Sequence, residues 1–140
     1  MKFEYLEDVA TADIAFRAQA KNLNELFEIC ALATSDTMVD VKTIKQKIKK
    51  NLNLESDDLE QLLVLFLSEL VYLKDAELLF FSKFEVKLKG NTLKAKILGD
   101  KYSDKMKFKN DVKAITMHLL KIEKKKETYF ATVVLDIWGD

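Results

Sequence analysis

Two aspartates stand at the ends of apolar runs, where an ionised side chain is costly to bury. Asp13 directly precedes Ile14-Ala15-Phe16, a run typical of a strand that enters a hydrophobic core. Asp136 lies near the end of the chain and closes one face of the last predicted strand, after Phe130, Thr132 and Val134. Burial of an ionised carboxylate is strongly unfavourable unless a cation, hydrogen-bond donors or a shared proton compensates it.

Paired carboxylates suit one kind of chemistry in particular. Two such groups brought together repel each other unless they bind a metal ion or share a proton. Carboxylate and carbonyl oxygens without histidine partners are the ligands that a hard divalent cation prefers. The spacing alone leaves a second interpretation open, in which Asp13 and Asp136 are separate turn or capping residues.

His118 is the only histidine, so a catalytic histidine pair or a multi-histidine metal site within one chain is excluded. Strand alternation in the segment VKAITMHLL groups it with Ala114 and Thr116, opposite Ile115, Met117 and Leu119. It is either a site residue or a sheet histidine that a local hydrogen bond satisfies.

Lysines gather at residues 42–50 and 121–126, where they could follow a phosphate backbone, and Phe and Tyr are available for stacking. The alternative is that they belong to solvated strand faces and a turn. The three glycines, Gly90, Gly99 and Gly139, lie far apart, so the chain has no glycine-rich phosphate loop. A nucleotide-binding enzyme of a standard kind is not expected.

Two amphipathic segments predict helices. The first follows a strand at residues 13–20: Asn22, with Glu25 three residues on, resembles a helix N-cap. Its apolar stripe predicts one buried face that includes Cys30. The second helix opens after Ser56-Asp57-Asp58 and is apolar on nearly every side, which indicates contact with more than one layer.

The remaining segments predict strands. Residues 41–54 are rich in lysine with spaced aliphatics and predict an exposed strand. Residues 84–97 alternate around a Gly90-Asn91 turn, and a second hairpin is predicted from residue 112 onward, joined by the polar run 123–128. The expected fold is α+β, with two helices packed on a mainly antiparallel sheet, in a single domain over residues 1–140.

Composition narrows the classes of function. The 140 residues carry 23 Lys plus Arg and 23 Asp plus Glu, so no global field favours nucleic acid or membrane. One cysteine excludes an intramolecular disulfide and a multi-cysteine zinc site, which makes a cytoplasmic location the default expectation. No signal peptide or membrane segment is expected, because the acidic N-terminus lacks an apolar run and LLVLFL stops at Ser68-Glu69.

Several segments taken in order resemble the archease family over essentially the whole chain: TADIAF, NLNELFEICALA, DLEQLLVLFLSELVYL, VKAITMH and VVLDI. This resemblance implies a small α+β protein that assists an RtcB-type RNA ligase in tRNA splicing. Such a protein promotes guanylylation of the ligase and restores its turnover, without being a ligase itself, and involves tRNA only indirectly. A chaperone-like or RNA-binding module with structural acids is the alternative, and a metal-dependent hydrolase lacks an assignable general base.

The resemblance also implies a metal site formed by Asp13, Asp136 and the main-chain oxygen of Ile137. The expected ion is calcium, with magnesium or manganese as alternatives. Many archeases carry an acid and a histidine where this chain has Val9-Ala10. The role of that histidine is either absent from this chain or transferred to Asp8 or His118. Because the chain continues through Trp138 to Asp140, Ile137 carries no terminal carboxylate, and Asp140 could replace it.

Overall fold

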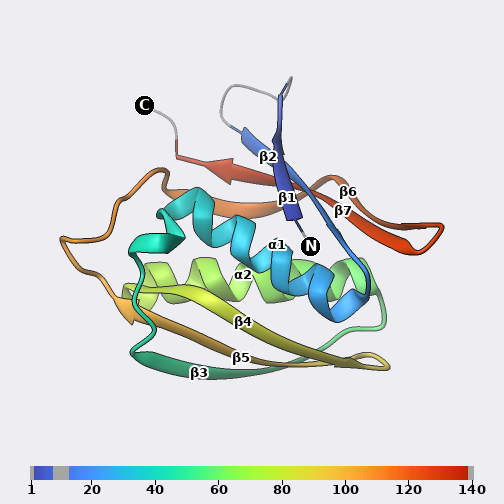
Figure 1. The fold of residues 1–140 in the computed structure, drawn as a ribbon, viewed down its shortest axis with the longest axis horizontal. Helices are drawn as coiled ribbons and strands as arrows, with labels where there is room; N and C mark the ends of the chain where they lie inside the picture. The colour runs from blue at the N-terminus through green and yellow to red at the C-terminus, as the bar shows by residue number, and fades with distance from the viewer. Residues whose placement is uncertain (1, 8–12, 139–140) are drawn as a thin grey trace.

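Two antiparallel sheets enclose two helices in the computed structural model, which describes residues 2–7 and 13–138 (Figure 1). The four-stranded sheet has the order β1-β2-β7-β6, with bounds Lys2–Leu6, Asp13–Ala20, Thr128–Ile137 and Val112–Lys125. The three-stranded sheet has the order β3-β5-β4, with bounds Ile48–Glu55, Thr92–Lys101 and Leu79–Lys89. Helices α1 (Leu23–Met38) and α2 (Leu59–Glu77) lie between the sheets. The predicted α+β class is confirmed, with the strands divided between two sheets.

Local signals in the sequence position the helices and one hairpin as predicted. Asn22 caps α1, since its side-chain oxygen accepts a 2.9 Å hydrogen bond from the Glu25 backbone N–H. Asp58 caps α2 in the same way. The β4–β5 turn places Gly90 at φ +58°, a left-handed conformation that glycine adopts without strain.

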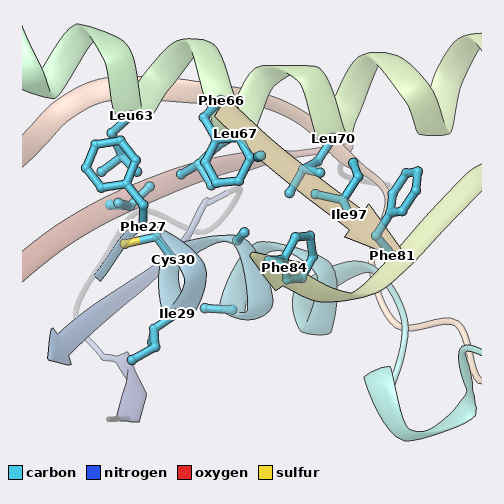
Figure 2. Packing of buried hydrophobic residues seen from close by; sticks show 14 of the residues in the cluster. Phe27, Ile29, Cys30, Leu63, Phe66, Leu67, Leu70, Phe81, Phe84 and Ile97 are labelled. Carbon is cyan, nitrogen blue, oxygen red and sulfur yellow. The ribbon is translucent and has the colours of Figure 1, made fainter. Parts of the chain in front are cut away.

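The core forms where α1 and α2 face each other and both sheets (Figure 2). The rings of Phe27 and Phe66 stack at 6.4 Å between centroids, and Phe81 and Ile97 approach from the three-stranded sheet. Helix α2 contacts β6 on one side and β3 and β4 on the other, which explains its apolar residues on nearly every side. Cys30 is fully buried as predicted, and burial raises the pKa of its thiol.

The predicted alternation of β6 is wrong beyond Thr116. Thr116 pairs with Val134, and the next pair is Lys121 with Thr132. Between these two pairs the chain advances five residues in β6 but only two in β7, so β6 bulges. Leu119 in this bulge has φ +59°. Its side chain is 57% exposed and that of Met117 is 56% exposed. The position of His118 therefore does not follow from alternation.

Three further features of the secondary structure differ from expectation. β1 is missing from the predicted strands, although Lys2-Phe3-Glu4-Tyr5 alternates between polar and apolar residues as a strand does. The segment 41–54 divides into a 3-10 turn, Val41–Thr43, and β3, which starts only at Ile48. β6 continues through Lys125, which is half of the polar run 123–128, and leaves a tight turn in which Lys126 has φ +57°.

Replacing Phe66 by Ala is expected to lower the free energy of unfolding by about 3–5 kcal/mol, because it leaves a cavity between the helices. Denaturant unfolding followed by circular dichroism measures this loss. Tyr72→Ala on the same helix is the matched control, since Tyr72 is 58% exposed. Similar losses for the two variants would contradict the placement of the core.

Candidate functional site

Asp13 and Asp136 lie directly opposite each other in the β2–β7 pairing. Both side chains are partly buried. Opposed residues of antiparallel strands project from the same face of the sheet. The structure thus brings together two acids that are 123 positions apart, the separation between residues 13 and 136.

The strand pairing indicates the direction of the Ile137 carbonyl, the third expected ligand. Trp138 donates its backbone N–H to the Asp111 carbonyl at 3.0 Å, so the peptide groups of Trp138 face β6. Peptide groups alternate along a strand, and the carbonyl of Ile137 is therefore directed to the β2 side. By the same alternation, Asp13 and Asp136 form a non-hydrogen-bonded pair, the type with Cα atoms only about 4.5 Å apart.

The oxygen donors at this strand end are of the type that a hard cation prefers, but the side chains alone supply too few of them. Two carboxylates and a carbonyl supply oxygen ligands only, as Ca²⁺ or Mg²⁺ prefers. Among residues 2–7 and 13–138, no group of three or more His, Cys, Asp or Glu side chains could hold a metal. Further ligands would have to be main-chain oxygens or water.

Cations near this strand end interact with aromatic rings. Lys113 is the extra residue in a bulge of β6, between Val112, which pairs with Ile137, and Ala114, which pairs with Asp136. Its ammonium lies 4.4 Å from the centroid of the Trp138 ring. In the described part of the chain, neither Asp13 nor Asp136 takes part in an ion pair. Sequence reasoning missed Lys113, which the motif VKAITMH contains.

A polar network borders the site. Asp13 lines a surface hollow of about 340 Å³ together with Tyr5, Thr37, Lys109 and Asn110. Tyr5 donates its hydroxyl to the Asp36 carboxylate at 3.0 Å. Lys109 donates to the same carboxylate oxygen at 3.1 Å. The network joins β1, α1 and the β5–β6 loop, and no local pattern in the sequence indicates it.

Burial raises the pKa of Tyr5 to about 12, with a smaller contribution from the neighbouring charge and hydrogen bond of Asp36, while the Thr37 hydrogen bond opposes the shift. The phenol is therefore protonated throughout the neutral range and keeps its hydrogen bond to Asp36.

A buried lysine fixes the start of β6 beside the site. Lys74 of α2 donates to Asp111 at 2.6 Å and also to Asp75. Burial alone would lower the pKa of Lys74, but the hydrogen bonds and charges of Asp111 and Asp75 outweigh it and raise the pKa. Because the Asp111 carbonyl binds Trp138, this ion pair ties α2 to the end of β7.

His118 lies apart from the two acids in the pairing. It is exposed within the β6 bulge, beyond the Thr116–Val134 pair, and its backbone N–H donates to Thr116 Oγ1 at 3.2 Å. The predicted substitutes Asp8 and Asp140, and the departure at Val9-Ala10, lie outside the described residues.

The fold and this strand end define a small α+β protein in which two aspartates face each other where β2 begins and β7 ends. Comparison with known proteins gives its family. The chain belongs to the Archease protein family (MTH1598/TM1083), whose model matches residues 3–137.

Relatives and solved structures agree with this assignment. The chain is similar to Protein archease of Sulfurisphaera tokodaii, at 40% identity over 97% of this chain and 99% of that protein. Protein archease of Pyrococcus abyssi is 43% identical over 91% and 94% of the two chains. The solution structure of Methanobacterium thermoautotrophicum protein 1598 matches with a TM-score of 0.83 and 32% identity, over 96% and 97%.

A crystal structure from Thermotoga maritima, described as an archease and possible chaperone, shares the fold with a TM-score of 0.61 and 21% identity, over 91% and 92%. The two relatives are named Protein archease, a name that does not describe a catalysed reaction. No helix in the described part of the chain is long and apolar enough to cross a membrane.

Replacing Tyr5 by Phe is expected to flatten the loss of stability at alkaline pH. An unfolded tyrosine loses its proton near pH 10.0, whereas folded Tyr5 keeps it to about 12. Between these values the unfolded state binds fewer protons, so the free energy of unfolding falls as pH rises. Urea unfolding from pH 9 to 11 measures the slope. Tyr72→Phe is the matched control for loss of a hydroxyl, and equal slopes for wild type and Tyr5→Phe would contradict the assignment.

Proposed function

We propose that the protein activates an RtcB-type RNA ligase in tRNA splicing by promoting guanylylation of the ligase, and so its turnover. Membership of the archease family over residues 3–137 is the observation that carries the proposal. On this proposal the protein is a cofactor of the ligase and is not itself an enzyme. Its action is cytoplasmic, and tRNA is involved through the ligase.

The metal site of this proposal consists of Asp13, Asp136 and the main-chain oxygen of Ile137. The opposed register of the two acids supports it, because their mutual repulsion creates a need for a counter-charge. Calcium is the first candidate, with magnesium and manganese as alternatives, since all accept oxygen ligands. A bound ion would supply positive charge to nucleotide phosphates at the ligase active site.

The chain's own cations would assist in binding such phosphates. Lys113 and Lys109 border the two acids from β6 and from the loop before it. Their ammonium groups could pair with phosphate oxygens and orient them toward the acidic strand end. The Lys74–Asp111 pair would keep this part of β6 in place.

A chaperone-like role is the second candidate. The exposed Met117 and Leu119 in the β6 bulge favour it, because exposed apolar side chains on a sheet edge can bind other chains. Such a role needs neither Asp13 nor Asp136. Prevention of aggregation by a double Asp13→Asn/Asp136→Asn variant would therefore separate the two candidates.

Asp13→Asn and Asp136→Asn are each expected to abolish calcium binding measured by calorimetry. In the absence of metal, each is expected to raise the free energy of unfolding by about 0.2–1 kcal/mol, because a cross-strand repulsion is removed. Glu55→Gln, an exposed acid on the other sheet, is the control. Unchanged affinity for calcium and magnesium in both variants would refute the site.

An RtcB-type ligase stalled after one turnover is expected to resume joining RNA when this protein, GTP and a divalent metal are added. Asp13→Ala and Asp136→Ala are expected to abolish this rescue while the circular dichroism spectrum stays native. Guanylylated ligase and multiple-turnover joining are the two readouts. The protein without ligase should neither join RNA nor retain covalent nucleotide.

The acidic site and ligase activation can fail separately in this assay. Equal rescue by the wild type and both variants would refute the role of the acidic site and leave ligase activation standing. No rescue by the wild type, tested with the ligase of its own organism, would refute ligase activation.

A further inference from the structure

The three-stranded sheet turns one face away from the helices (Figure 1). The strand register and the exposure of alternate residues place many lysines on this face. We define the lysine face by the alternate residues of β3, β5 and β4 that point outward: Lys49, Asn51, Asn53 and Glu55; Thr92, Lys94, Lys96 and Leu98; and Lys83, Glu85, Lys87 and Lys89. It holds six lysines, all exposed, and two glutamates. The chain as a whole is neutral, so its charge is unevenly distributed.

The lysines are distributed over the whole lysine face. Each of the four rows that cross the strands contains at least one, and rows are about 6.6 Å apart along a strand. A shallow hollow of about 480 Å³ lies on this face and is lined by Asn51, Asn53, Lys87, Lys94 and Lys96, with Glu85 among them.

These lysines have few counter-ions. In the described part of the chain, Lys96 pairs with Glu85 at 3.7 Å, and the other five lysines of the lysine face form no ion pair. Lys87 and Lys94 are directly opposed across β4 and β5. Like charges in that position destabilise a sheet. Stability of the sheet alone therefore does not account for this pair, whereas an anionic ligand would.

The lysines of the β6–β7 hairpin differ from those of the lysine face. Lys124 lies 5.3 Å from the centroid of the Tyr129 ring and Lys125 lies 5.8 Å from that of Phe130, while Lys121 pairs with Glu123. Arg17 occupies the Phe130 ring as well, at 4.4 Å. Cations already cover these rings, which single-stranded RNA would need for stacking.

We propose that the lysine face binds the phosphate backbone of double-stranded RNA. The face has no aromatic side chain on which an unpaired base could stack, so charge is its main means of recognition. An RNA duplex is recognised through phosphates and 2′-hydroxyls rather than through its bases. Asn51 and Asn53 beside the lysines supply amide groups that can bond to 2′-hydroxyls.

The lysine face and the acidic strand end lie on opposite sheets, with both helices between them (Figure 1). Duplex binding is therefore compatible with occupation of the acidic site, and it does not depend on ligase activation being correct. An RNA substrate could lie on one sheet while the other approaches a protein partner.

Fluorescence anisotropy with a labelled RNA duplex at several salt concentrations tests the proposal. The wild type is expected to bind with strong salt dependence. A triple variant, Lys83→Gln/Lys87→Gln/Lys94→Gln, is expected to bind at least tenfold more weakly. Its slope of log K against log salt should be smaller by about 2, as expected for three lost phosphate contacts. The matched control is Lys121→Gln/Lys124→Gln/Lys125→Gln on the other sheet, which should retain wild-type binding.

Lys87→Glu separates binding from folding. It places an acid opposite Lys94, so its melting temperature is expected to equal or exceed that of the wild type while its affinity for RNA falls. Equal losses of binding in the two triple variants would overturn the proposal, as would tighter binding of a single strand than of the duplex, or no binding at about 50 mM salt.

The same variants would also reveal whether the lysine face binds a ligand other than RNA. If the Lys83/Lys87/Lys94 variant bound RNA normally but bound the ligase poorly, an acidic protein surface would be the occupant, and the proposal would be wrong. Guanylylation of the ligase without RNA reports the acidic site alone, so its stimulation by the wild type tests ligase activation independently of duplex binding.

Discussion

The pairing of β2 with β7 is the interaction on which the site depends. Phe16 and Val133 are directly opposed in it and fully buried. A slip of either strand by one residue would turn its own member of this pair toward solvent, so burial fixes the register. Complete burial of side chains such as Phe16, Val133 and Leu135 contributes about 1.5–3 kcal/mol each. Like charges directly opposite each other in a sheet cost about 0.2–1 kcal/mol. The core therefore holds Asp13 against Asp136 at the cost of this repulsion, which a bound cation would offset.

The ion pair between Lys74 and Asp111 fixes the β6 side of the site. Lys74 is nearly buried, while its partner Asp111 remains exposed at the start of β6. A buried charge is unfavourable without a partner, and Asp111 provides this partner. The carbonyl of Asp111 also accepts the hydrogen bond from Trp138. On the opposite flank, Asp36 collects hydrogen bonds from Tyr5 and Lys109, which come from β1 and the β5–β6 loop. The edge strand β1 and the β5–β6 loop are thus fixed near Asp13 by specific polar contacts.

Features governed by neighbouring residues could be predicted from the sequence, and features governed by distant contacts could not. The Asn22 cap, the Gly90 turn and the buried face that holds Cys30 follow from local spacing. The β6 bulge does not, because its residues satisfy the alternating pattern of a strand and only the pairing with β7 reveals the extra length. The hydrogen bond from Tyr5 to Asp36 spans 31 positions and has no local signature. The pairing of Asp13 with Asp136 could be suggested only by family resemblance, since nothing near either residue specifies the other.

The chain has zero net charge, but the paired acids Asp13 and Asp136 and the lysine face concentrate opposite charges at separate places. The acidic strand end belongs to the four-stranded sheet and the lysine face to the other, with a layer of helices between them. Packed layers are about 10 Å apart, so the two surfaces are separated by about 20 Å. Exposed charges are screened over about 8 Å at physiological ionic strength. Each surface therefore acts on its own surroundings almost independently of the other. Attraction to an anion or a cation is therefore decided by the charged groups within about 8 Å of it rather than by the total charge of the chain.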